Sequence, residues 1–122
     1  MIKQNSGFTC TPRGEELAVR LTGEIDHHSA APLRTDLDRT LRELRPSCLV
    51  LDLSSVDFMD SSGLGLILGR LNLMHEMGGT MRLRSPGPRV ERVLRLAGLE
   101  RLLPIEYGET QDNVQSNSDG TC

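Results

Sequence analysis

The fold is decided around residues 58–65, which read Phe58-Met59-Asp60-Ser61-Ser62-Gly63-Leu64-Gly65. The apolar run at 48–53 before this stretch predicts a buried strand, and the leucine-rich run at 62–77 after it predicts a helix. The two serines therefore fall beside the unpaired N–H groups and the positive dipole end of that helix. A phosphate on a serine there would be held locally by the same donors. The stretch indicates a switch rather than a catalyst.

The four residues from Asp60 to Gly63 have two interpretations. Ser and Asp are favoured at helix N-termini, so the stretch can be a structural cap without chemistry. Alternatively, one serine carries a phosphate. Ser62 is the better N-cap candidate, because its side chain would point back at the helix N–H groups, which leaves the Ser61 hydroxyl in the loop. A phosphate on Ser61 would add about −1.5 to −2 charge beside Asp60 and would oppose a docked partner.

Length and composition describe a single domain without nucleic-acid chemistry. The chain has 122 residues, a net charge of −3 and an aromatic fraction of 2%, so a base-stacking or strongly basic surface is not expected. The N-terminus has no apolar leader, and the apolar run at 64–68 is too short to span a bilayer. We therefore expect a cytoplasmic protein with neither a nucleic-acid nor a membrane partner.

The reactive side chains exclude several kinds of site. Cys10, Cys48 and Cys122 show no CxxC spacing, which argues against a disulfide framework and a zinc site. The only lysine is Lys3, so a phosphate-binding lysine of the Walker type is missing. Neither a metal nor another cofactor is expected.

Strand and helix patterns alternate along most of the chain. Extended segments at 5–12 and 17–22 form a hairpin around a turn at 13–16. The pattern then predicts a loop at 23–28, a helix capped by Ser29 and ending near 45, the strand at 48–53, the helix at 62–77, a strand at 80–84, a helix from about 88, and an extended piece at 102–105. Such an order requires crossover connections, and hence a small α/β domain with a mostly parallel sheet.

The ends of the chain differ in composition. Residues 1–107 contain the predicted elements and form one domain. From Gly108 onward the residues are almost all polar, and little there can bury apolar area, so we expect 108–122 to be a disordered tail.

Two loops are predicted to meet at one edge of the sheet. If their strands are parallel, the loop that contains Asp26 and the loop that contains Ser61 lie at the same carboxyl edge, where sites commonly form.

A hydrolase would need a nucleophile elbow, which is missing, and adjacent His27 and His28 rarely share a metal. A glycine-rich dinucleotide loop at 63–69 is weakly supported; packing of that helix face is the simpler interpretation. Five arginines predict a solvated face: Arg82, Arg84, Arg89, Arg92 and Arg95.

Two motifs resemble one known family. Residues 23–30, Gly-Glu-Ile-Asp-His-His-Ser-Ala, and residues 58–70, which begin with the quoted stretch and continue as Leu-Ile-Leu-Gly-Arg, are similar to the sporulation anti-sigma factor antagonists, which are STAS-domain proteins. The resemblance runs over about residues 15–105, with both motifs in the expected order. The second motif is the more specific one, because the first occurs more widely in STAS domains.

The resemblance implies a fold and a mechanism. The fold is a sheet of four or five strands with helices mainly on one face. The unphosphorylated protein binds an anti-sigma factor that is also a serine kinase, and so releases the sigma factor. Phosphorylation of the residue that aligns with Ser61 ends binding, and a serine phosphatase restores it. The implied partner-binding residues are Asp26, Asp60, Ser61, Ser62 and Gly63; the protein itself is no enzyme.

Two other functions remain open at this point. The chain could be a STAS module of another circuit, such as a stress-response regulator or a subunit of a lipid-transport complex. It could also hydrolyse a nucleotide or ester at Ser61, although the motifs for either reaction are missing.

Overall fold

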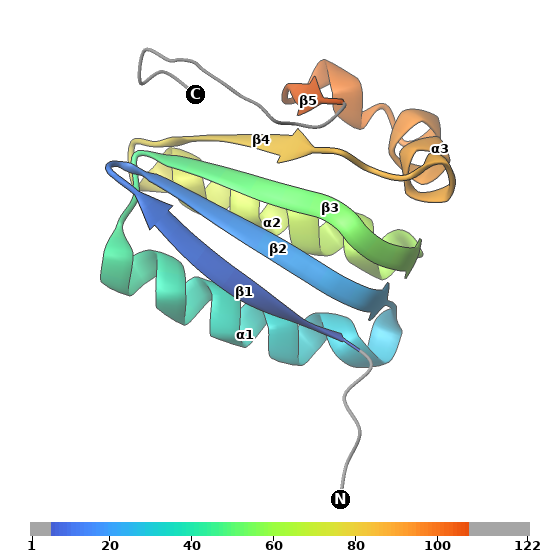
Figure 1. The fold of residues 1–122 in the computed structure, drawn as a ribbon, viewed down its shortest axis with the longest axis horizontal. Helices are drawn as coiled ribbons and strands as arrows, with labels where there is room; N and C mark the ends of the chain where they lie inside the picture. Colours follow the sequence, from blue (N-terminus) through green and yellow to red (C-terminus); the bar gives the residue numbers. More distant parts are fainter. Residues whose placement is uncertain (1–5, 108–122) are drawn as a thin grey trace, which may run out of the picture.

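Five strands form one mixed sheet in the order β1-β2-β3-β4-β5 (Figure 1). The computed structural model describes residues 6–107. Strand β1 (Ser6–Arg13) pairs antiparallel with β2 (Glu16–Ile25), and the other three follow in parallel: β3 (Cys48–Met59), β4 (Thr80–Arg84) and β5 (Ile105–Glu106). The predicted α/β class and mixed, mostly parallel sheet are confirmed.

Two long helices cover one face of this sheet. Helices α1 (His27–Leu44) and α2 (Ser61–Glu76) lie side by side behind it in the view of Figure 1. Helix α3 (Pro88–Leu96) follows β4 at the end of the sheet where β2 and β3 also end, and a 3₁₀ turn (Leu99–Arg101) leads to β5. The prediction that helices pack mainly on one face is confirmed.

The core lies between the sheet and these helices. Alternate residues of each strand face the helices, because successive side chains of a strand point to opposite faces. The sheet contributes Leu17, Val19, Leu21, Leu49, Leu51 and Leu83, all no more than 1% exposed. The helices contribute buried apolar residues at helical spacing, including Leu37, Leu41, Ile67, Met74 and Leu94. Leucine, isoleucine, valine and methionine side chains make up this buried cluster, and the partly buried Phe8 packs against it.

A buried ion pair ties α1 to α2. Arg70 is only 4% exposed, and its Nε lies 3.0 Å from Oδ1 of Asp38. Burial lowers the pKa of Arg70, while the Asp38 carboxylate works in the opposite direction. Removing either side chain while the helices stay packed would leave the other charge buried without its partner, which is strongly unfavourable. The pair therefore helps to fix one helix against the other.

The boundaries of the elements around 23–29 differ from the predicted ones. Strand β2 continues to Ile25 and α1 begins at His27, so the predicted loop at 23–28 is wrong. The N-cap is Asp26 rather than Ser29, which instead takes the third helical position of the same capping box. Strand β3 likewise runs to Met59 rather than to 53, because its register with β2 continues to that residue.

The C-terminal part also departs from the prediction. Leu96 is 82% exposed, and Val90 and Leu94 are the buried residues of α3, so this helix buries only a narrow apolar side. The predicted extended piece at 102–105 is mostly turn, and β5 comprises just Ile105 and Glu106. The predicted tail at 108–122 lies outside the described residues.

Candidate functional site

Two strand ends place two aspartates next to each other. In the parallel register of β2 and β3, Ile25 lies opposite Met59, and each is the last residue of its strand. The next residue is Asp26 in one chain segment and Asp60 in the other, and each caps the helix that follows. The backbone N–H of Asp60 donates to the carbonyl of Ile25 over 3.3 Å, which links the two segments. The predicted meeting of these two segments at one edge is therefore observed.

Asp26 holds the start of α1 through a capping box. Its Oδ1 accepts hydrogen bonds from the backbone N–H groups of His28 (2.9 Å) and Ser29 (3.0 Å). In return, the backbone N–H of Asp26 donates to Oγ of Ser29 over 3.0 Å, and that hydroxyl donates to the carbonyl of Glu24 over 2.8 Å. These bonds satisfy donors that a helix start otherwise leaves unpaired.

The same hydrogen bonds set the ionisation of Asp26. The backbone N–H of Ser29 is the largest cause of a lowered Asp26 pKa, and the N–H and the charge of His28 act in the same direction. Partial desolvation opposes them without reversing the shift. The carboxylate form is thus the form that the folded site favours.

Asp60 plays the equivalent part for α2. Its Oδ1 accepts from the backbone N–H of Ser62 over 2.8 Å, and its carbonyl accepts from Gly63 (2.9 Å) and Leu64 (3.3 Å). The prediction that Ser62 is the N-cap is wrong, because the carboxylate of Asp60 already occupies that position. Ser61 is accordingly the first residue of the helix and does not lie in a loop.

The two serines differ in exposure. Ser61 is exposed and Ser62 is half-buried. Within residues 6–107, the Ser61 hydroxyl has no hydrogen bond. Asp60 accepts from the N–H groups of Ser62, Gly63 and Leu64, so few backbone donors of this helix start remain for a group attached to Ser61. New charge on Ser61 would therefore stay largely exposed to a partner.

Gly63 brings the first turn of α2 against the strand ends. A Cβ on this residue would overlap Cγ of Met59 and lie 3.3 Å from Cγ2 of Ile25, so neighbouring atoms would have to shift. Glycine is required at position 63 because the packing there is close, and not because the backbone has an unusual angle. By contrast, a Cβ on Gly65 or Gly69 would meet nothing within 4 Å, so the prediction that these two glycines serve close packing of a helix face is wrong.

One exposed apolar side chain next to the site has no role in the sequence interpretation. Phe58, the second-last residue of β3, is 39% exposed although it is large and apolar. It lies two positions before Asp60 and pairs in register with Glu24 of β2. The sequence signal for this residue was an aromatic side chain within residues 58–65. The sequence alone does not reveal whether such a ring faces the core or the solvent.

The two adjacent histidines lie apart from any cluster of metal ligands among residues 6–107. His27 and His28 lie in the first turn of α1, exposed, with ring centroids 5.5 Å apart in an edge-to-face arrangement. In the part of the chain from residue 6 to residue 107, no group of three or more His, Cys, Asp or Glu side chains could hold a metal ion. Within the same residues, no helix has the length and apolar character needed to cross a membrane.

Comparison with known proteins agrees with this geometry. The STAS domain family matches residues 5–116. The chain belongs to the STAS domain family. Its relatives include the anti-sigma F factor antagonist of Paenibacillus polymyxa, which is 43% identical over 93 residues, covering 76% of this chain and 80% of the relative.

Solved STAS structures share the fold. The unphosphorylated form of the anti-sigma factor antagonist SpoIIAA superimposes with a TM-score of 0.71 at 28% identity, covering 86% of this STAS domain chain and 90% of that one. The phosphorylated form of the Bacillus cell fate determinant SpoIIAA gives a TM-score of 0.65 at 27% identity, with 86% and 93% covered. The resemblance inferred from the two motifs is confirmed at the level of the family and the fold.

The close approach at Gly63 predicts a clear difference between two glycines of the same helix. Gly63→Ala should destabilise the domain by about 1–3 kcal/mol, because the new methyl group overpacks against Met59. Gly65→Ala, in open space, should instead stabilise it by about 0.5–1 kcal/mol through helix propensity. Urea unfolding of both variants measures these changes; equal effects would contradict the packing argument.

The lowered pKa of Asp26 predicts a pH-dependent contribution to stability. A depressed carboxyl pKa stabilises the fold above the unfolded-state value of about 3.9 and ceases to do so as the pH falls through the folded-state value. Wild type should therefore have a higher Tm than Asp26→Asn at neutral pH, and the difference should shrink below about pH 4. Thermal unfolding across pH 2–7, with Asp57→Asn as an exposed control, measures it. Parallel curves for wild type and Asp26→Asn would exclude this linkage.

Proposed function

We propose that this STAS domain is an anti-sigma factor antagonist that is switched off by phosphorylation of Ser61. In its unphosphorylated form it binds an anti-sigma factor and so releases a sigma factor for transcription in the cytoplasm. The names of its relatives support this function over that of a lipid-transport subunit. The observation that carries the switch is the exposed Ser61 hydroxyl on the first turn of α2, beside the capping carboxylate of Asp60.

The partner in this proposal is an anti-sigma factor that also acts as a serine kinase. Its docking surface comprises Asp26, Asp60, Ser61, Ser62 and Gly63. A serine phosphatase that recognises phosphorylated Ser61 returns the protein to its binding form. The STAS domain itself is then a kinase substrate and not an enzyme.

Phe58 supplies an apolar contact for this interface. Interfaces gain much of their binding energy from a few buried aromatic side chains surrounded by polar groups. Phe58 is the exposed aromatic residue in the motif that also holds Asp60 and Ser61. Polar groups of the two caps would form the rim around it.

Charge explains how the switch works. A phosphate on Ser61 adds about −1.5 to −2 charge at an edge that already holds Asp60 and Asp26. The dipole of α2 softens the repulsion within the domain, so the fold itself tolerates the group. A docked partner, in contrast, would have to desolvate the new charge or place an acidic group against it, and its affinity falls.

Phosphate mapping tests the site. Incubation with the cognate anti-sigma kinase and ATP should place one phosphate on Ser61, as read by mass spectrometry. Ser61→Ala should abolish the modification, whereas Ser62→Ala should retain it, because the Ser62 hydroxyl makes no cap bond in the structure. A phosphate found on Ser62 would refute the assignment.

A charge substitution tests the mechanism separately. Ser61→Asp should weaken binding to the anti-sigma factor at least about tenfold, a difference of about 1.4 kcal/mol, while the uncharged Ser61→Asn binds nearly as wild type. Titration calorimetry at low and high salt measures both, and salt should reduce the difference through screening. Equal weakening by Asp and Asn would replace the electrostatic explanation with a steric one.

A further inference from the structure

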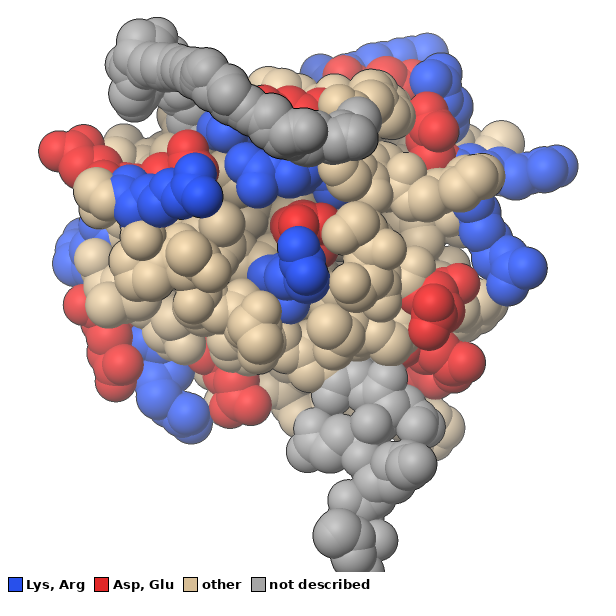
Figure 2. All heavy atoms as spheres, in the orientation of Figure 1, with Lys and Arg blue, Asp and Glu red and all other residues tan. Residues whose placement is uncertain are grey.

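The face of the sheet opposite α1 and α2 carries no helix within residues 6–107, and Figure 2 shows acidic and basic side chains gathered at its centre. We refer to it as the open face. Its strands hold a shallow hollow of about 300 Å³. Cavities that bind small molecules measure roughly 300–1,000 Å³, so this hollow has room for a small ligand only.

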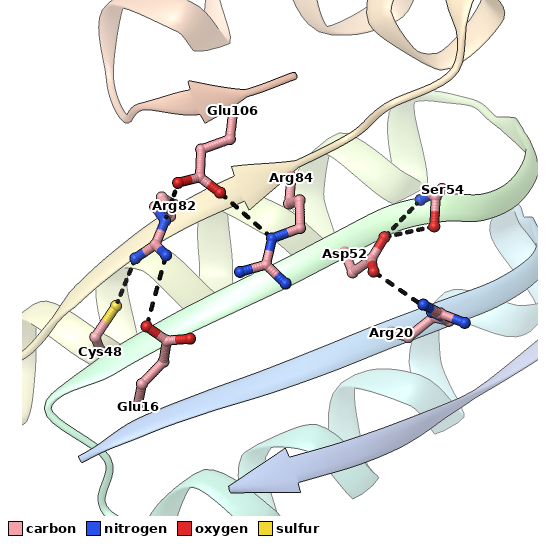
Figure 3. A network of polar contacts seen from close by, with 8 residues as sticks. All are labelled: Glu16, Arg20, Cys48, Asp52, Ser54, Arg82, Arg84 and Glu106. Atoms are coloured by element: carbon pink, nitrogen blue, oxygen red, sulfur yellow. Dashed lines mark hydrogen bonds and ion pairs between the residues drawn. The ribbon is translucent and has the colours of Figure 1, made fainter. Parts of the chain in front are cut away.

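An ion pair between neighbouring strands fixes one arginine on this face (Figure 3). Arg20 Nε lies 3.4 Å from Oδ2 of Asp52. The other oxygen of Asp52 accepts hydrogen bonds from the backbone N–H of Ser54 over 2.9 Å and from its hydroxyl over 2.7 Å. Because Asp52 is held on both sides and is only 8% exposed, it is a firm anchor for the Arg20 guanidinium.

Two further arginines project from β4 on the same face. Nη2 of Arg82 lies 3.5 Å from Glu16, and its Nε lies 3.1 Å from Glu106. The prediction that the arginines form a solvated face is therefore wrong for Arg82, whose side chain is only 13% exposed. Arg84 donates from Nε to Glu106 over 3.3 Å, but its side chain is 33% exposed and lines the hollow.

The hollow forms where a short side chain lies between two long ones. Glu16, Ala18 and Arg20 are successive open-face positions of β2, since alternate residues of a strand share a face, and all three line the hollow. Thr11 of β1 pairs in register with Ala18. Thr9 pairs with Arg20, and both threonines line the hollow as well. The centre of the hollow is therefore a methyl group, with hydroxyls on the β1 side.

The arginines of the lining retain unpaired donors. Arg13, Arg20 and Arg84 all line the hollow. Within residues 6–107 the Arg13 side chain makes no hydrogen bond or ion pair, and Arg20 and Arg84 each donate through Nε alone. The remaining N–H groups of a guanidinium form a planar fork that matches the two oxygens of a carboxylate. The hollow therefore presents three such forks.

The acidic side chains of the lining disfavour a doubly charged group. Glu16 and Asp52 also line the hollow, where Arg82 and Arg20 hold them. A phosphate concentrates about −1.5 to −2 charge on one group, and these carboxylates would repel it. A polycarboxylate instead spreads its charge over separate groups. Forks that project from β1, β2 and β4 fit several single charges better than one double charge.

We propose that the hollow binds a small di- or tricarboxylate. Its carboxylate groups pair with the forks of Arg13, Arg20 and Arg84, and its carbon chain lies over the methyl group of Ala18. The ion pairs that Arg20 and Arg84 make at Nε orient these side chains and leave their terminal nitrogens to the ligand. Little ordering of the arginines is then needed when the ligand binds, which favours affinity.

This site is separate from the edge that carries Ser61. Glu16, which lines the hollow, is the first residue of β2, whereas Ile25, which precedes the Asp26 cap, is the last. Binding of the carboxylate therefore does not depend on the phosphorylation switch, and either can fail without the other.

Titration with citrate tests the site in the full-length chain. Citrate added to isotope-labelled protein at constant ionic strength should shift the amide signals of Thr11, Ala18 and Arg20 and the side-chain Nε–H signals of Arg20 and Arg84. Signals of exposed residues on α1 and α2 should stay in place. Inorganic phosphate is the comparison anion, and citrate should bind at least about tenfold more tightly.

Matched variants separate the shape of the hollow from its charge. Ala18→Ile fills the hollow with a residue that strands favour and should abolish the shifts at unchanged net charge, whereas Ala18→Ser should keep them. Arg13→Gln should weaken citrate binding about two- to fivefold, the size expected of an exposed ion pair. Arg92→Gln, on the exposed side of α3, should not change it. If Ala18→Ile does not fold, the two arginine variants decide the question.

Four outcomes would overturn the proposal. Citrate that shifts none of these signals in wild type would exclude the site. Phosphate that binds as tightly as citrate would show that separate carboxylates are not preferred. Shifts that persist in folded Ala18→Ile would place the anion outside the hollow. Equal weakening by Arg13→Gln and Arg92→Gln would show a general effect of net charge.

Discussion

Gly63 lets the first turn of α2 lie directly against Met59 at the end of β3 and Ile25 at the end of β2. Any side chain at this position would push the helix start away from the strand ends. The hydrogen bond between Asp60 and Ile25 joins the same two segments, so the contact sets the spacing of both caps. This contact also fixes the position of Ser61 relative to Asp26. The geometry of the site therefore depends first on how the backbone segments pack, and then on the side chains they carry.

The sheet has two faces with different chemistry, and the site belongs to neither. One face is covered by α1 and α2 and packed with apolar side chains, and the buried charge of Arg70 is paired there with Asp38. The open face keeps its arginines and carboxylates in cross-strand pairs. The carboxyl edge between them presents two helix N-termini whose donors are largely taken by their own caps. A group added to that edge changes what a partner meets and leaves the core untouched.

Several features followed from the sequence with little ambiguity. The periodicity of the leucines gave both long helices and their buried sides, and the alternation of elements gave the mostly parallel sheet. The errors concentrate at helix starts. Asp26 and Ser29, or Asp60 and Ser62, are all acceptable caps by type, and the choice between them depends on how far the preceding strand pairs with its neighbour. That register is a long-range property, which local propensity does not contain.

The sequence by itself determined the family, the class of fold and the presence of two acidic–hydroxyl segments at strand-to-helix junctions, because these depend on local patterns and on the order of elements. Only the tertiary structure decided that Gly63 is needed for close approach while Gly65 and Gly69 are not. It likewise decided that Phe58 and Leu96 face solvent and that Arg82 does not. Exposure and clearance depend on which residues, distant in the chain, come together, and no local spacing encodes that.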